Sequence, residues 1–399
     1  FEFKYSWKEF FIMANRIMLN QTSYHGAGAI QEIANEAKAH GFKKAFVCSD
    51  PDLVKFKVTA KVTDILTANG LDYELYSDIK ANPTIQNVQH GVEAFKASGA
   101  DYLIAIGGGS SMDTSKAIGI IIANPEFEDV RSLEGVAPTK KPCVPIIAVP
   151  TTAGTAAEVT INYVITDIER KRKFVCVDPH DMPIIAVVDP DMMSSMPKGL
   201  TAATGMDALT HAIEAYVSTD ANPLTDAAAI MAIKMIAHYL PKAVANGNYM
   251  KARDKMAYAQ YLAGIAFNNA SLGYVHAMAH QLGGFYNLPH GVCNAILLPY
   301  VESYNLIGNM NRFRDVAQAM GVQVEGISVT CAAEKAIEAI KKLSRQLEIP
   351  SDLKQLGVRE EDFGIMADNA KKDVCQLTNP RTATREQVIE IYRQAYVGE

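Results

Sequence analysis

The chain has 399 residues, of which 49% are hydrophobic and 21% are charged, and this length and composition allow two substantial globular domains. Its formal net charge of -6 gives no electrostatic reason to expect a nucleic acid or an anionic membrane surface as a partner, and its longest apolar runs are too short to span a bilayer. The six cysteines are widely scattered without a CxxC pair, which favours reduced thiols in the cytoplasm over a disulfide framework or a thiolate zinc site.

The first twelve residues differ from the rest of the chain. They hold six aromatic residues, lack an initiator methionine and are followed by an ordinary start at Met13. The dipeptide Lys8-Glu9 can be encoded by AAGGAG, a ribosome-binding sequence, a short distance upstream of the Met13 codon. Our hypothesis is that residues 1–12 are a non-native leader, and we leave them out of the fold prediction.

Between residues 43 and 190, short runs of β-branched and apolar residues alternate with helical periodicity. The predicted strands are Lys44 to Cys48, Tyr73 to Tyr76, Tyr102 to Ile106, Val144 to Val149 and Ile184 to Val188. The predicted helices between them include Ile85 to Ala97 and Asp113 to Ala123. This alternation predicts a mostly parallel sheet with helices on its faces.

After Asp189-Pro190 the sequence becomes rich in Ala and Met with helical spacing, as in Thr225 to Tyr239 and Met256 to Phe267. We therefore predict an α/β domain over residues 13–197 and a helical domain over residues 198–399.

A glycine-rich turn follows the predicted strand that ends at Ile106. It reads Gly107-Gly108-Gly109-Ser110, and Asp113 comes three residues later in a predicted helix. Glycines let the backbone approach a bulky anion, and the start of the helix presents free N–H groups, so the pattern favours phosphate binding over a plain turn. The spacing is not GxGxxG, which argues against an ordinary Rossmann fingerprint.

Two further loops follow predicted strands. Asp50 begins the first loop, where a carboxylate can accept hydrogen bonds from a ribose diol or can serve only as a turn or cap residue. The other loop holds Thr151, Thr152 and Thr155, and it suits either a ligand crevice or local bonding to its own backbone.

Five residues in the helical half are candidates for metal chemistry. Asp207 and His211 are four residues apart, so they share one face of a helix, and His276 and His280 repeat this spacing before His290. One carboxylate with imidazoles is typical of a site for iron(II) or zinc. An ordinary histidine is the alternative at each single position, but it does not explain the whole set.

The HxxxH spacing also occurs in metalloproteases. In this chain, however, Ala277 stands where that motif needs its general-base Glu, which argues against a peptidase. The basic run Arg170-Lys171-Arg172-Lys173 indicates a solvated hairpin, from which one side chain could reach a cofactor.

Together these elements resemble the iron-dependent (group III) alcohol dehydrogenase family, from about Asn15 to the C-terminus. The family's GGGSxxDxxK motif matches residues 107–116, its threonine-rich loop matches residues 151–155, and its metal signature matches Asp207, His211, His276 and His290. The resemblance implies a Rossmann-like parallel-sheet domain followed by a helical metal-binding domain, a plan shared with dehydroquinate synthase.

The resemblance also implies a role for each candidate residue. The metal is held by Asp207, His211, His276 and His290, and His280 acts as the proton-relay histidine. The pyrophosphate region of the cofactor lies against Gly107, Gly108, Gly109, Ser110 and Asp113. The rest of the cofactor contacts Asp50, Asn82, Thr151, Thr152, Thr155, Lys173 and, near the nicotinamide, Asn162.

The implied cofactors are NAD, favoured over NADP by the charge of Asp50, and a divalent metal. Ligand chemistry leaves iron(II) and zinc open, and the resemblance selects iron. The implied reaction is hydride transfer between a small alcohol and the nicotinamide, with the metal polarising the substrate oxygen and His280 passing the proton outward. The resemblance further implies a homodimer.

The substrate depends on a finer resemblance. Residues 82–165 are most similar to family members that interconvert lactaldehyde and 1,2-propanediol, whereas residues 200–294 are equally similar to bacterial ethanol dehydrogenases, notably at Gln281. The small substrate pocket of the lactaldehyde enzymes matches Asn162, Val164, Phe267 and Cys375. The last three of these residues would also be common in any core.

Two other classes remain as alternatives. A lyase like dehydroquinate synthase shares the two-domain plan, but the helical half lacks the basic cluster that a phosphate-bearing substrate needs. A non-enzymatic metal-binding scaffold leaves the glycine-rich turn unexplained.

Overall fold

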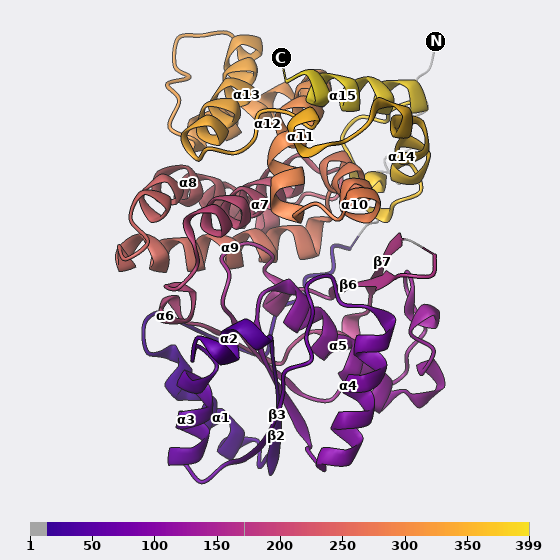
Figure 1. Cartoon of the computed structure of the whole chain (residues 1–399). Coiled ribbons are helices and arrows are strands. Elements are labelled where there is room, and N and C mark those ends of the chain that lie inside the picture. Colours follow the sequence, from indigo (N-terminus) through magenta and orange to yellow (C-terminus); the bar gives the residue numbers. More distant parts are fainter. Residues whose placement is uncertain (1–13, 171, 399) are drawn as a thin grey trace, which may run out of the picture.

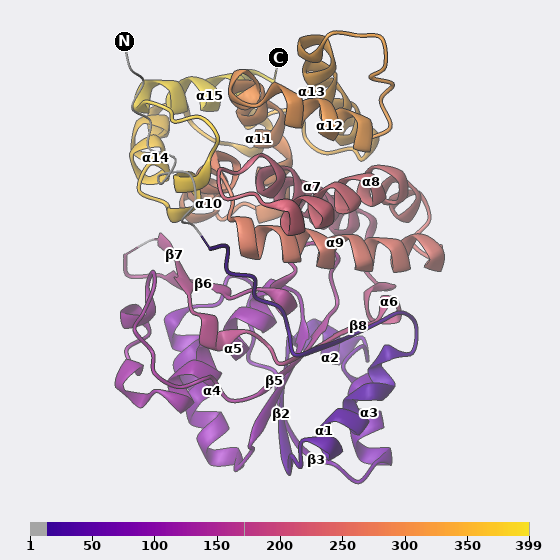
Figure 2. The same ribbon diagram turned by 180° about the vertical axis from the view of Figure 1, so that it is seen from behind.

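Six strands form a sheet in the order β1-β8-β5-β4-β2-β3, and every pair of neighbours that the structure describes in it is parallel (Figures 1 and 2). The structure is a computed structural model that describes residues 14–170 and 172–398, so the predicted leader lies outside the described residues. The strands are β1 (Thr22–His25), β2 (Lys44–Ser49), β3 (Asp72–Tyr76), β4 (Tyr102–Gly107), β5 (Ile146–Pro150) and β8 (Ile185–Val188).

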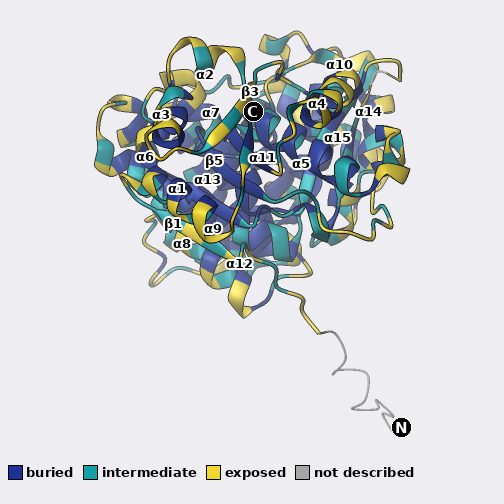
Figure 3. Ribbon diagram, turned by 90° about the horizontal axis from the view of Figure 1, so that it is seen from below, coloured by how far each residue is buried: buried dark blue, intermediate teal, exposed yellow. Residues whose placement is uncertain are grey.

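Helices cover both faces of this sheet because successive strand side chains point to opposite faces. In β4, Leu103 and Ala105 pack with α4 and α5, whereas Ile104 and Ile106 pack with α1 and α3. The inner strands β2, β4, β5 and β8 are buried on both sides, whereas the edge strands β1 and β3 are partly exposed, and most other exposed residues lie on outer helix faces and loops (Figure 3). These helices are α1 (Glu32–Ala39), α2 (Pro51–Lys55), α3 (Ala60–Ala68), α4 (Ile85–Ser98) and α5 (Gly109–Ala123).

A two-stranded antiparallel hairpin stands between the sheet and the helical half. It consists of β6 (Asn162–Asp167) and β7 (Arg172–Val177), with Asn162 opposite Val177. The basic run begins in its turn and continues into β7, which confirms the predicted hairpin.

The second half of the chain is helical and lies above the carboxyl ends of the strands (Figure 1). After the short α6 (Pro190–Met193), the long helices α7 and α9 pack against α8, and the remaining helices lie around α10 and α11. These helices are α7 (Lys198–Val217), α8 (Pro223–Ala245), α9 (Met250–Ala270), α10 (Tyr274–Tyr286), α11 (His290–Asn305), α12 (Met310–Ala319), α13 (Val329–Gln346), α14 (Phe363–Ala370) and α15 (Arg385–Val397). The predicted fold class, a parallel-sheet domain followed by a helical domain, is confirmed.

Among the described helices, α8 is long and apolar enough to cross a membrane by length and composition. It packs against both α7 and α9 through a face that includes Ala229, Ile233 and Leu240. Asn222 caps its first turn by accepting hydrogen bonds from the N–H groups of Leu224 and Thr225. In this structure α8 is therefore a core helix of the second domain.

Two details differ from the sequence prediction. Helix α5 begins at Gly109, four residues before the predicted Asp113, because the first turn of a helix tolerates glycine that would weaken its interior. The predicted strand from Val144 begins at Ile146, because Val144 instead donates its N–H to the carbonyl of Gly119.

Candidate active site

A cavity of about 260 Å³ lies between the two halves of the molecule. Its walls combine the carboxyl end of the sheet and the β6–β7 hairpin with helices α7, α9, α10 and α11. Ligand sites in parallel α/β folds commonly lie at this end of the sheet. The sequence-predicted residues that line it are Asn82, Gly109, Ser110, Asp113, Thr155, Asn162, Val164, Lys173, Asp207, His211, Phe267, His276, His280, His290 and Cys375.

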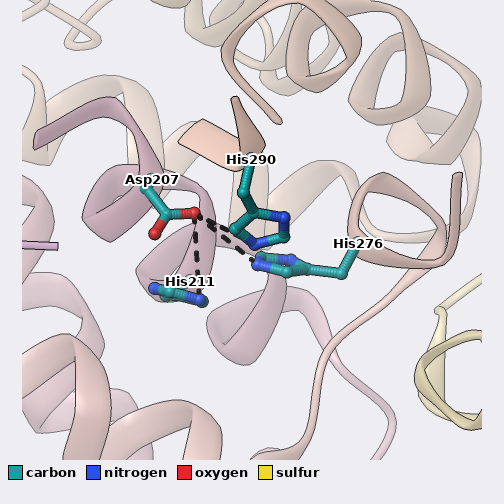
Figure 4. A group of neighbouring side chains, drawn as sticks. All are labelled: Asp207, His211, His276 and His290. Carbon is teal, nitrogen blue, oxygen red and sulfur yellow. Dashed lines mark ion pairs between the residues drawn. The ribbon is translucent and has the colours of Figure 1, made fainter. Parts of the chain in front are cut away.

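The four predicted metal ligands converge at the helical side of this cavity (Figure 4). Their ligand atoms all lie within 4.8 Å of one another. Oδ1 of Asp207 is 3.6 Å from Nε2 of His290, 3.9 Å from Nε2 of His276 and 4.0 Å from Nε2 of His211. The helical positions explain the convergence, because α7, α10 and α11 each present one or two of these side chains to the same point.

Burial keeps the three imidazoles neutral. It lowers the pKa of His211, lowers that of His276 well below its ordinary value and lowers that of His290 to about 4, although the nearby carboxylate of Asp207 opposes the shift in His211 and His290. A neutral imidazole retains a lone pair that a metal can accept. The distances from Asp207 are therefore those of neighbouring donor atoms rather than of ion pairs.

This donor set fits a divalent metal ion. Bonds of about 2.1 Å in a tetrahedral arrangement separate neighbouring donor atoms by roughly 3.4 Å, close to the distances from Asp207 to the histidines. The side-chain amide of Asn294 also lies at this point, where its Nδ2 is 2.7 Å from Oδ1 of Asp207 and 3.1 Å from Nε2 of both His276 and His290. One carboxylate and three imidazoles suit iron(II) or zinc.

His280 lies one turn after His276 on α10 and belongs to a different group of side chains. Its Nδ1 is 2.8 Å from Oδ2 of Asp373, and these two residues form a second group with Cys375. Burial alone would raise the pKa of Asp373, but His280 and the N–H of Cys375 hold it below its ordinary value. The two histidines of the HxxxH segment therefore line one cavity but have different hydrogen-bond partners.

The glycine-rich turn is held by close packing against the threonine loop. Gly107 has φ +152°, and a Cβ there would lie 2.2 Å from Oγ of Ser111, so this position requires glycine. Its carbonyl accepts the N–H of Thr151 at 2.9 Å. A Cβ on Gly108 would lie 3.2 Å from Cγ2 of Thr152, so this second glycine brings the two loops together. The cavity wall therefore rests on a second layer of residues, namely Gly107, Gly108, Thr151 and Thr152.

Asp50 does not line the cavity, but it stands beside the glycine-rich turn. It follows Ser49, whose strand partner is Ile106, and it is the N-cap of α2. Its Oδ1 accepts the N–H of Leu53 at 2.9 Å, so the cap interpretation of this residue is confirmed.

Polar side chains bridge the two halves at the cavity. Lys173 in β7 donates from Nζ to Oδ1 of Asn82 at 2.7 Å, and Asn82 donates from Nδ2 to Oδ1 of Asn287 at 2.7 Å. Asn287 ends α10 in the helical half. Deeper in the cavity, burial raises the pKa of Asp113 to about 7, and the nearby Lys116 opposes that rise.

The four predicted pocket residues all face the cavity. Phe267 is 7% exposed, and its ring stacks on that of His211 with the centroids 4.2 Å apart. Cys375 is equally buried, so both residues are core residues as well as cavity walls. The backbone carbonyl of Asn162 accepts a hydrogen bond from Nζ of the buried Lys116 at 2.9 Å, which fixes the start of β6.

Sequence reasoning missed three polar residues at the site, namely Glu214, Asn294 and Asp373. For two of them a signal existed. Glu214 lies seven residues after Asp207, and Asn294 lies four residues after His290, so each shares a helix face with a candidate ligand. Asp373 lies 93 residues from His280 in the sequence, so only the tertiary structure brings the two together.

Comparisons with known proteins agree with this geometry. Residues 20–190 match the family described as iron-containing alcohol dehydrogenase, and residues 201–396 match the C-terminal part of the same family. Lactaldehyde reductase of Escherichia coli (strain K12) is 55% identical over 384 residues, which cover 96% of this chain and 100% of that protein.

Two further relatives extend the comparison. NAD-dependent methanol dehydrogenase of Bacillus methanolicus is 46% identical over 370 residues, which cover 93% of this chain and 97% of that protein. The crystal structure of a 1,3-propanediol oxidoreductase superposes with a TM-score of 0.94 at 45% identity and covers 96% of this chain and 100% of that one. The chain is an alcohol oxidoreductase and belongs to the iron-containing alcohol dehydrogenase family.

Proposed function

We propose that this enzyme interconverts lactaldehyde and 1,2-propanediol, using NAD and a divalent iron ion. The observation that carries the proposal is the cluster of one carboxylate and three neutral imidazoles in a cavity that also reaches the start of α5. The 55% identity to a lactaldehyde reductase supports the choice of substrate.

In this proposal Asp207, His211, His276 and His290 hold the iron. When bound, the iron polarises the substrate oxygen, and the nicotinamide of NAD gives or takes the hydride. Zinc suits the same donor atoms, and family membership favours iron. Phe267 covers one face of His211 and keeps water away from that side of the cluster.

His280 is the proposed proton relay. Because its Nδ1 is held by Asp373, its Nε2 is the nitrogen that remains to take or give a proton. The contact also fixes the orientation of the ring, which a relay needs for repeated transfers along one direction.

The proposed cofactor contacts follow the cavity from the sheet to the helices. The N–H groups at the start of α5 face an anion favourably, and among the described residues no side chain caps this helix. Gly107, Gly108, Gly109, Ser110 and Asp113 therefore surround the pyrophosphate region. Asp50 accepts hydrogen bonds from the ribose, and the remaining contacts come from Asn82, Thr151, Thr152, Thr155, Asn162 and Lys173.

The substrate pocket is proposed to be the space between the metal cluster and Asn162, Val164, Phe267 and Cys375. The aromatic ring and the branched side chain leave room for about two or three carbons, and the amide of Asn162 binds the second hydroxyl of the diol. A site built to bond a hydroxyl rejects an analogue without it by up to ~10⁴-fold, whereas one methylene changes selectivity only ~10–200-fold.

The test is a panel of ethanol, 1-propanol, 1,2-propanediol, 1,3-propanediol and glycerol with enzyme that has been loaded anaerobically with iron(II). We expect the highest kcat/KM for (S)-1,2-propanediol, with NADH accumulating as the diol is consumed. A higher kcat/KM for ethanol would replace the proposal by an ethanol dehydrogenase. Product formation without net NADH would indicate a lyase, which recycles its cofactor.

Three further features belong to the proposal. The chain divides into residues 13–197 and 198–399. The enzyme works in the cytoplasm, and its six free cysteines support a reducing compartment. It forms a homodimer, which light scattering of the purified protein tests directly.

A further inference from the structure

A buried carboxylate behind the metal cluster ties α7 to α10. Glu214 is 2% exposed, and each of its oxygens meets a different group on α10. Oε1 lies 2.7 Å from the backbone nitrogen of Val275, and Oε2 lies 2.5 Å from Nδ1 of His276. The other ring nitrogen of His276, Nε2, faces Oδ1 of Asp207 at 3.9 Å.

The chemistry of these contacts fixes where the proton of His276 resides. The N–H of Val275 can only donate, so it occupies one carboxylate oxygen as an acceptor. With the carboxylate ionised opposite a bound cation, the second oxygen accepts from Nδ1, which carries the proton, and Nε2 retains the lone pair. We propose that Glu214 is a positioning residue for the metal centre, one that holds His276 in the tautomer and orientation needed for Nε2 to bind iron. The inference rests on the proposed function, in which His276 is a metal ligand.

The position of Glu214 in the sequence supports this role. It follows Asp207 by seven residues and His211 by three, so one face of α7 carries two proposed ligands and the support of a third. A buried carboxylate is costly unless its oxygens are bonded, and here both are bonded to α10. Hydrogen bonds of this kind from a ligating histidine to a carboxylate fix its ring and strengthen its basicity.

The start of α10 is shaped to admit this carboxylate. Gly273 precedes the helix, and a Cβ at that position would lie 2.8 Å from Oε1 of Glu214 and 2.7 Å from Oδ1 of Asn379. Its φ of -150° is extended backbone that any residue adopts, so glycine is needed here for space alone. A side chain at Gly273 would therefore displace Glu214.

An amide cannot replace the carboxylate. The side chain of Gln offers one oxygen, so it can accept either from Val275 or from His276, and its NH₂ group faces the other donor. The contact between these two donors becomes favourable if His276 carries its proton on Nε2 instead, but this removes the lone pair that binds the metal. Glutamine is nearly equal in size to glutamate, so Glu214→Gln is expected to change the tautomer of His276 with little change in packing.

The experiment compares metal affinity in the full-length wild type, Glu214→Gln and Glu158→Gln. Glu158 is a matched control because it is also a buried carboxylate, but it bonds Gln260 instead of a ligand. Iron(II) and cobalt(II) dissociation constants are measured by chelator competition, with far-ultraviolet circular dichroism to verify folding. We expect Glu214→Gln to bind about 10–100-fold more weakly and to show an altered cobalt absorption spectrum, and Glu158→Gln to resemble the wild type.

Two further measurements keep the inference falsifiable if Glu214→Gln folds poorly. Gly273→Ala is expected to weaken cobalt binding in the same direction, and ¹⁵N NMR of the zinc-loaded wild type is expected to show His276 protonated at Nδ1. Wild-type affinity in a folded Glu214→Gln, or a zinc-loaded wild type in which Nδ1 of His276 carries no proton, would overturn the inference. If the wild type binds no iron, or if His276→Ala binds it normally, it is instead the proposed function that fails.

Discussion

Oδ2 of Asp373 accepts a hydrogen bond from Nδ1 of His280 at 2.8 Å, between a turn near the C-terminus and the middle of α10. His276 has a different partner, the carboxylate of Glu214 on α7. Two histidines four residues apart on one helix are therefore oriented by two carboxylates from opposite ends of the helical half. This difference makes their proposed roles separable by mutation.

His276→Ala is expected to lose the metal, because it removes one of four donors, whereas His280→Ala is expected to keep the metal and to lose rate. General acid–base groups contribute about 10²–10⁴-fold, and we expect kcat of His280→Ala to fall within that range. Metal content after gel filtration and kcat of iron-loaded protein check the two effects. Loss of the metal from both variants would refute the division of roles.

Asp50→Gly is expected to lower the preference for NAD over NADP, because it removes a carboxylate that repels the 2′-phosphate. The capping bond to Leu53 is lost as well, but glycine at an N-cap costs only a few tenths of a kcal/mol. The ratio of kcat/KM for the two cofactors is the measurement, with Asp52→Asn as a control for general charge. An unchanged ratio would mean that Asp50 does not lie at the ribose.

Phe267→Ala is expected to enlarge the pocket and to admit longer or aromatic alcohols. Since the ring is 7% exposed, its removal is expected to reduce the free energy of unfolding by roughly 3–5 kcal/mol. The stack on His211 is lost too, so iron affinity is expected to fall with the stability. Urea unfolding and kcat/KM for 1-butanol and benzyl alcohol test both effects, and unchanged selectivity would place Phe267 outside the substrate pocket.

Glu302→Gln is expected to stabilise the metal-free protein at high pH. Burial raises the pKa of Glu302 to about 7, so between about pH 4.5 and 7 the folded state binds more protons than the unfolded state, and this group lowers stability as the pH rises. At pH 5 the carboxyl is neutral and resembles the amide, whereas at pH 8 the variant is expected to be more stable by roughly 3 kcal/mol. Equal effects of the substitution at both pH values, measured by urea unfolding, would show that Glu302 titrates normally.

The sequence predicted the sheet well where hydrophobic runs are long, as in Tyr102 to Ile106. Helical spacing made Asp207, His211 and His276 candidates, and the family resemblance completed the ligand set with His290. The prediction missed β1, since four residues with no buried alternation acquire strand structure only by pairing with β8, more than 150 residues away. Asp373 was missed for a related reason, because only the packing of distant segments brings it to His280 on α10. Glu214 shares a helix face with Asp207, but its contact with His276 on α10 likewise exists only in the folded structure.

The metal cluster has a consequence for the lifetime of the protein. Its side chains come from α7, α10 and α11, so an ion bound there links three helices that span more than 80 residues of the chain. A ligand that binds only the folded state stabilises it by about 2.7 kcal/mol at 100 times its dissociation constant. Iron would then act as a removable crosslink as well as a reagent. A lack of iron would therefore lower the resistance of the enzyme to heat and proteolysis and would also abolish its activity.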